Sequence, residues 1–90
     1  MSLHLYRGAR LRYDRTREQH VLLRAEEVTE LNATAFEILS LCDGRSDAAV
    51  VHELLTRYPQ ADPAELAADV AEFLAEAQAS QWVQRTEGTP

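Results

Sequence analysis

The feature that most constrains the fold is a change in apolar spacing at Asn32. Before this residue, Leu11 and Tyr13 alternate with charged residues, as in a strand with one buried face. After it, apolar residues recur every three or four positions, as on an amphipathic helix, at Ala35, Ile38, Leu39 and Cys42. The chain is therefore expected to form a sheet first and helices afterwards, which is an α+β architecture.

Three segments have strand character, namely residues 10–14, 19–23 and 27–31. The polar residues 15–18 fit a hairpin loop between the first two, and the turn type stays open. Residues 80–85 are a candidate for a short last strand. These segments predict an N-terminal antiparallel sheet of two or three strands.

A three-helix bundle is expected to follow the sheet. Asn32 is a good N-cap for the first helix, and Gly44 can adopt the left-handed conformation that ends a helix. Either Ser46 or Asp47 can cap the second helix, and Pro59 would end it. Its buried stripe would consist of Val51, Leu54, Leu55 and Tyr58.

The third helix has the clearest start. Asp62 can cap it, Pro63 suits the first helical position, and Glu65 completes an Asp-x-x-Glu capping box. Its apolar stripe would consist of Leu66, Val70, Phe73, Leu74 and Ala77. The second and third helices would form a helix-turn-helix pair, and the attached sheet would make the fold winged-helix-like. The 90 residues fit one domain, expected over residues 1–86, with 87–90 as a loose tail.

The net charge of −6 is unevenly distributed. Residues 1–24 hold six of the nine arginines against two acids, whereas the remainder holds three arginines against thirteen acids. The simpler interpretation is a solvated surface. The alternative is that the basic segment meets an acidic partner or the acidic helices of a second subunit.

No pattern in the sequence points to catalysis, a metal or a cofactor. His4, His20 and His52 lie far apart, and the single cysteine, Cys42, falls on the apolar face of the first expected helix. The three glycines form no phosphate-binding loop. We therefore expect no enzyme activity, no catalytic residue, no metal ligand and no cofactor.

No segment approaches the roughly 20 apolar residues of a membrane span, and the start has no apolar run of signal-peptide length. A single cysteine also fits a reducing compartment. These features predict a soluble cytoplasmic protein that does not contact a membrane.

Nucleic-acid binding is disfavoured by charge. The third helix would be the reading helix, and its outward residues are all acidic: Glu65, Asp69, Glu72 and Glu76. Binding to DNA depends on neutralising several phosphates, so this acidic stripe would repel it. We expect no nucleic-acid partner, and a winged-helix adaptor for another protein or nucleic acid remains the alternative function.

Peptide recognition fits these features better, because an exposed sheet edge can accept an extended segment as an extra strand. A groove between residues 27–31 and the third helix would be floored by Val28, Leu66, Val70 and Phe73. Such a stripe is more often core than groove. Both can hold if part of each side chain packs inward and part lines the cleft.

Three segments, in this order and spacing, resemble the PqqD family of pyrroloquinoline quinone (PQQ) biosynthesis: LRYDRTREQHVLL (11–23), ELNATAFEILSLCDG (30–44) and DVAEFL (69–74). The resemblance implies a winged-helix-like recognition element that binds no cofactor and catalyses nothing itself. Such a peptide chaperone would hold the ribosomally made precursor peptide PqqA. It would present PqqA to PqqE, a radical S-adenosylmethionine enzyme that cross-links a Glu and a Tyr side chain of the peptide.

The resemblance also implies a peptide site beside the third strand and against the third helix. Its residues would be Val28, Thr29, Glu30, Leu31, Leu66, Asp69, Val70 and Phe73. Arg12, Asp14 and Arg15 match the LRYDR piece (11–15) of the first segment, where their role would be either hairpin structure or contact with the partner enzyme. The charge split adds a separate hypothesis, that the basic hairpin exchanges between two chains and forms a homodimer.

Overall fold

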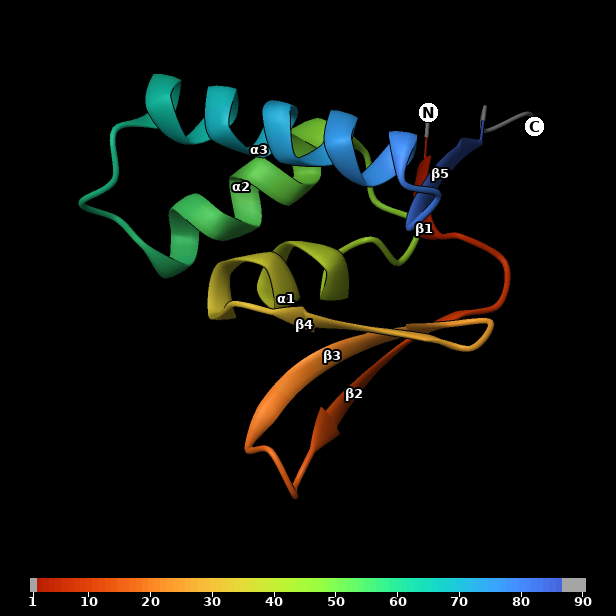
Figure 1. Cartoon of the computed structure of the whole chain (residues 1–90). Coiled ribbons are helices and arrows are strands. Elements are labelled where there is room, and N and C mark those ends of the chain that lie inside the picture. Colours follow the sequence, from red (N-terminus) through yellow and green to blue (C-terminus); the bar gives the residue numbers. More distant parts are fainter. Residues whose placement is uncertain (1, 87–90) are drawn as a thin grey trace.

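The computed structural model describes residues 2–86, so the predicted loose tail at 87–90 lies outside the described residues. Eight elements follow one another along the chain. They are β1 (Ser2–Leu5), β2 (Ala9–Asp14), β3 (Gln19–Arg24), β4 (Glu27–Leu31), α1 (Ala33–Ser40), α2 (Asp47–Arg57), α3 (Pro63–Ala79) and β5 (Val83–Thr86). The predicted α+β class is confirmed, with strands first and three helices after them (Figure 1).

The three predicted N-terminal strands form one antiparallel sheet in the order β2–β3–β4. Residues 15–18 connect β2 to β3, as the polar composition of this segment predicts. One carboxylate oxygen of Asp14 accepts the backbone N–H of Thr16 at 3.0 Å and that of Arg17 at 3.3 Å. Asp14 therefore closes the hairpin through local hydrogen bonds, which is a common role for an aspartate at a turn.

The sheet and the helices form layers. Helix α1 lies across the sheet and contacts all three of its strands. Helices α2 and α3 lie on the other side of α1 and pack against each other (Figure 1). The short helix α1 is therefore the layer that joins the sheet to the helix-turn-helix pair.

The predicted last strand is present, but the sequence did not reveal its partner. β5 pairs with β1 in a separate antiparallel ribbon, in which Leu5 lies opposite Val83 and Ser2 lies opposite Thr86. β1 is also tied to the segment between α1 and α2, because the N–H of Gly44 donates to the carbonyl of Leu3 at 2.8 Å. A four-residue strand has too little alternation to be recognised from its own sequence.

The predicted helix starts are confirmed. The side chains of Asn32, Ser46 and Asp62 each accept a backbone N–H from the first turn of their helix, at 2.7, 3.1 and 2.9 Å. Ser46 rather than Asp47 is therefore the cap of α2. Each of these bonds satisfies a donor that the helix itself leaves unpaired.

The end of the first helix differs from the prediction. Helix α1 ends at Ser40, so Cys42 lies in the turn beyond it and Gly44 does not cap it. Gly44 does have a positive φ of 113°, but it uses this conformation in the link to α2. Cys42 is still buried, and its thiol donates to the carbonyl of Ile38 at 3.4 Å.

The predicted stripe of α2 is partly wrong. Val50 and Leu54 are the buried residues of this helix, whereas Val51 and Leu55 are half-buried and Tyr58 is 48% exposed. Tyr58 lies one residue beyond the helix, where φ −127° and ψ 72° leave the helical conformation. On α3, Val70, Leu74 and Ala77 of the predicted stripe are buried, whereas Leu66 and Phe73 are half-buried.

Replacing Leu39 by alanine should test the central role of α1. Leu39 is 1% exposed, so Leu39→Ala should lower the free energy of unfolding by about 2–5 kcal/mol through lost burial and the cavity left behind. Val28 is 51% exposed, so Val28→Ala should change the free energy of unfolding by about 0.5 kcal/mol or less. Urea denaturation measures both, and equal midpoints for the two variants would contradict the layered packing around α1.

Candidate functional site

Strand β4 is an edge strand. It pairs with β3 on one side, and no other described strand pairs with its second side. Its residues alternate between two environments: Leu31 is buried toward α1 and Thr29 is half-buried, whereas Val28 and Glu30 are exposed on the outer face of the sheet. An open edge of this kind presents unpaired backbone N–H and C=O groups to an extended peptide.

The outer face of the sheet has an apolar centre. Val21 is only 2% exposed although it lies outside the main core, and it sits between Arg12 on β2 and Glu30 on β4. Val21, Leu23 and Val28 line a shallow hollow of about 340 Å³, together with residues 12–15 at the end of β2. We call this region the sheet hollow.

The sheet hollow is lined by all three residues whose role the sequence left open, namely Arg12, Asp14 and Arg15. They differ in what they contact. Asp14 forms the turn hydrogen bonds and an ion pair with Arg17 at 3.8 Å, so it has a clear part in hairpin structure. Arg12 and Arg15 are exposed, and neither forms an ion pair with any residue between 2 and 86. Two free guanidinium groups therefore border the apolar centre of this face.

A second hollow lies between α1, the end of α2 and the start of α3. We call it the α1–α3 hollow, and its volume is about 330 Å³. Most of its wall is apolar: Ile38, Leu54, Leu66 and Val70 come from the three helices, and Ala61 comes from the link between α2 and α3. Thr34, Glu37, Tyr58 and Asp69 supply its polar groups. A cavity of about 150 Å³ can hold a benzene ring, so this hollow has room for a large side chain.

The residues expected to floor one groove lie in two separate hollows, the α1–α3 hollow and the sheet hollow. Leu66, Asp69 and Val70 lie together in the α1–α3 hollow, whereas Val28 lines the sheet hollow on the other face of the sheet. Phe73 is half-buried against the core and lines neither hollow. A floor shared by Val28 and the α3 residues is therefore not formed, because strand alternation turns Val28 away from α1. The role of all eight residues in peptide binding stays a prediction.

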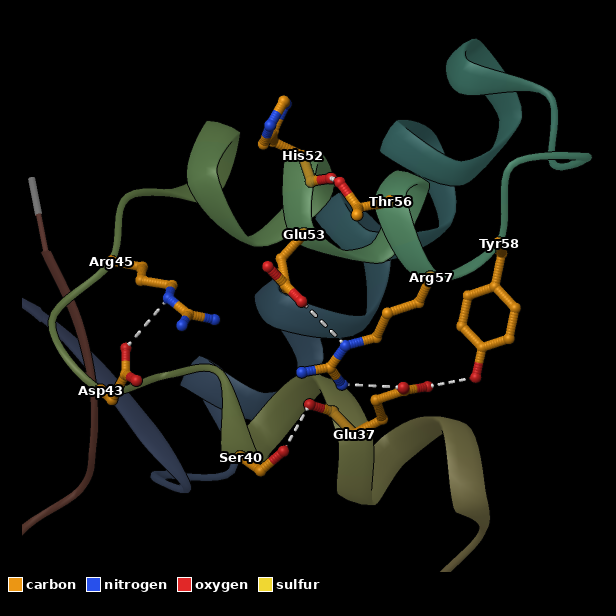
Figure 2. A network of polar contacts seen from close by, with 9 residues as sticks. All are labelled: Glu37, Ser40, Asp43, Arg45, His52, Glu53, Thr56, Arg57 and Tyr58. Atoms are coloured by element: carbon orange, nitrogen blue, oxygen red, sulfur yellow. Dashed lines mark hydrogen bonds and ion pairs between the residues drawn. The ribbon is translucent and has the colours of Figure 1, made fainter.

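Glu37 connects the end of α2 to α1 (Figure 2). Its carboxylate accepts the hydroxyl of Tyr58 at 2.6 Å and the guanidinium of Arg57 at 2.9 Å, and Arg57 also pairs with Glu53 at 3.0 Å. The Tyr58 hydrogen bond, followed by that of Arg57, lowers the pKa of Glu37 below its ordinary value of 4.5. The Glu37 hydrogen bond in turn raises the pKa of Tyr58. No sequence pattern indicated this contact, because Tyr58 has the spacing of a core residue.

Glu37 and Tyr58 also form the wall between the α1–α3 hollow and a neighbouring hollow of about 320 Å³. In the neighbouring hollow, the imidazole of His20 stacks on Phe36 with ring centroids 3.8 Å apart, and Tyr13 meets His20 edge-on at 5.0 Å. This stack half-buries His20 against α1. Aromatic pairs of this kind add to the packing between sheet and helix.

Residues 2–86 contain neither a candidate metal site nor a candidate membrane span. No group of three or more His, Cys, Asp or Glu side chains in this range could hold a metal ion. No helix there is both long and apolar enough to cross a bilayer.

Burial, together with the nearby Asp43 and Asp47, raises the pKa of the Cys42 thiol to about 11.

Comparison with known proteins identifies the family. The sequence model of a family described as coenzyme PQQ synthesis protein D (PqqD) matches residues 19–83. This chain belongs to the PqqD family. A solution NMR structure of the PqqD part of Methylobacterium extorquens PqqCD, described as a functional and stand-alone recognition element for ribosomally synthesised and post-translationally modified peptides, superimposes with a TM-score of 0.74. It is 36% identical and the match covers 92% of this chain and 88% of that one, which confirms the predicted fold.

Several similar proteins carry the name PqqA binding protein. The protein from Rhodopseudomonas palustris (strain BisB5) is 46% identical over 71 residues, which are 78% of this chain and 69% of that protein. The protein from Klebsiella pneumoniae (strain 342) is 42% identical over 78 residues, which are 86% of this chain and 83% of that protein. The bifunctional coenzyme PQQ synthesis protein C/D of Methylorubrum extorquens is 41% identical over 71 residues, but the match spans only 19% of its length.

Replacing Tyr58 by phenylalanine should raise the pKa of Glu37 toward 4.5, because the largest cause of its lowered value is removed. A lowered folded-state pKa stabilises the fold fully above the unfolded pKa, and this contribution is lost as pH falls through the folded pKa. Tyr58→Phe should therefore lose less stability than the wild type when the pH is lowered below 4.5. Carboxyl-detected NMR titration and urea melts measure the two effects. Tyr13→Phe is the control, and an unchanged Glu37 pKa in Tyr58→Phe would contradict the contact.

Cys42 should resist thiol reagents while the protein is folded. With a pKa of about 11, roughly a thousandth of the thiol is ionised at pH 8, and the thiolate is the reacting form. Reaction with a disulfide reagent should be slow in buffer and fast in concentrated urea. Equal rates in the two conditions would show that Cys42 is accessible in the native state.

Proposed function

We propose that this protein is a peptide chaperone of PQQ biosynthesis that binds the precursor peptide PqqA and presents it to the radical S-adenosylmethionine enzyme PqqE. The observation that carries the proposal is the open edge of β4 in a chain of the PqqD family. The names of the relatives support PqqA as the peptide. In this role the protein works in the cytoplasm, without a cofactor and without catalysing a reaction itself.

Binding a disordered peptide at β4 requires both an open strand edge and pockets for its side chains. Ordering five residues of a disordered peptide costs roughly 5–10 kcal/mol in backbone entropy. Each main-chain hydrogen bond to β4 returns only about 1 kcal/mol net, so the edge alone does not offset this cost. Burying one large apolar side chain contributes about 1.5–3 kcal/mol. A peptide on β4 therefore needs a hollow nearby, and Thr34, three residues after Leu31, already lines the α1–α3 hollow.

Contact with PqqE is proposed at the sheet hollow. Arg12 and Arg15 are free of carboxylate partners among the described residues, and they border the exposed Val28. This combination suits an acidic surface with an apolar centre on the enzyme. Binding PqqA and PqqE at once would make the encounter of peptide and enzyme effectively intramolecular, at a local concentration that can reach the millimolar range.

Self-association by hairpin exchange remains a separate proposal. The sheet is joined to β1 through the short segment Tyr6–Gly8, where Gly8 has a positive φ of 86°. Reorientation at this segment and at Asn32 would let the basic hairpin of one chain pack on the helices of another. Light scattering from micromolar to millimolar concentration tests it, and a monomer at every concentration would exclude it.

An isotope-labelled NMR titration with a synthetic PqqA peptide tests the peptide role. We expect amide shifts to cluster on Glu27–Leu31 and on the first half of α3, because strand addition changes the environment of every edge amide. Shifts confined to β2, the other edge of the sheet, would contradict binding at β4. No shift at millimolar peptide would contradict the proposed function itself.

A second titration separates the chaperone from the alternative adaptor function. Duplex DNA added to the labelled protein should cause no shift, because Glu65, Asp69 and Glu72 are all exposed on α3. Shifts on α3 with DNA but not with PqqA would favour the nucleic-acid adaptor instead.

A further inference from the structure

The α1–α3 hollow combines an apolar wall with a one-sided charge. Its charged lining residues, Glu37 and Asp69, are both acidic, and no basic residue lines it in the described part of the chain. Asp69 is exposed and forms no ion pair with another residue in the range 2–86. Its carboxylate is therefore available to a positively charged group that comes from outside.

One wall of the hollow is held in place before any ligand arrives. Tyr58 is 48% exposed, and an exposed ring would ordinarily change rotamer freely. Here its hydroxyl donates to Glu37 at 2.6 Å, and Glu37 is fixed in turn by Arg57 at 2.9 Å (Figure 2). Because this wall is already ordered, binding a ligand does not incur the entropy cost of ordering it.

We infer that the α1–α3 hollow takes an aliphatic or aromatic side chain of a bound peptide whose neighbouring residue is lysine or arginine, with Asp69 selecting the basic neighbour. This inference rests on the proposed function and names the residue pair that the peptide presents. The volume of about 330 Å³ and the apolar residues Ile38, Leu66 and Val70 accept the apolar side chain. The Asp69 carboxylate rejects an acidic neighbour through like-charge repulsion.

Three short probes test the preference directly. They are the N-acetylated tetrapeptide amides Gly-Lys-Leu-Gly, Gly-Glu-Leu-Gly and Gly-Lys-Ser-Gly, titrated while the methyl signals of Ile38, Leu66 and Val70 are observed. The Lys-Leu probe should bind about 1.4- to 5-fold more tightly than the Glu-Leu probe, the range given by one exposed ion pair. The Lys-Ser probe should shift these methyls least. Equal binding of the first two probes would overturn the charge preference, and equal binding of the first and third would overturn the apolar one.

Matched variants locate both effects. Asp69→Asn should reduce the difference between the Lys-Leu and Glu-Leu probes, whereas Glu72→Gln removes the same charge from α3 outside the hollow and should leave the difference unchanged. Ala61→Leu should fill the hollow and weaken the Lys-Leu probe at least 5-fold, whereas Ala68→Leu adds the same side chain at an exposed position of α3 outside it. If the two members of either pair behave alike, the inference is wrong.

The PqqA titration separates failure of this inference from failure of the proposed function. Shifts on β4 without any shift of the three hollow methyls would leave the proposed function standing and overturn the inference. Methyl shifts with the Lys-Leu probe that Asp69→Asn weakens would support the inference, even if PqqA left β4 unshifted and the proposed function failed.

Discussion

Burial of α1 on two sides is the constraint on which the rest of the structure depends. An isolated helix of eight residues is not stable in water, so α1 depends on its neighbours. The sheet contacts one side of it, and α2 and α3 lie on the other, where Ile38 shares a hollow with Leu54 and Leu66 (Figure 1). The same helix fixes the distance between the open edge of β4 and the start of α3. The proposed peptide site, which uses both elements, would therefore be positioned by α1 and not by direct contact between the strand and α3.

The helix starts and the three-stranded sheet could be predicted because their causes are local. Asn32 and Asp62 cap their helices with their own side chains, and alternation over a few residues marks β2. The β1–β5 ribbon could not be predicted, because its strands are about 80 residues apart and each is short. The position of Tyr58 beside the α1–α3 hollow was not predicted, for a related reason. The apolar spacing of α2 does not reveal that the helix ends at Arg57, one residue before Tyr58.

The charge split in the sequence becomes a division between two faces of the molecule. The free arginines Arg12 and Arg15 lie at the sheet hollow, whereas the charged residues exposed on α3 are all acidic. Long-range electrostatics would then guide a basic peptide segment and an acidic protein surface to different sides. A recognition element with this arrangement can hold both partners together without making them compete for one surface.

The β1–β5 ribbon brings the two ends of the described chain together, since Ser2 lies opposite Thr86. A flexible tether or a second domain could therefore be joined at either end and would leave from the same corner. Neither attachment would interrupt a strand pairing of the β2–β3–β4 sheet. The ribbon makes this domain a portable module, one that can be genetically fused to a larger protein while its open edge stays available.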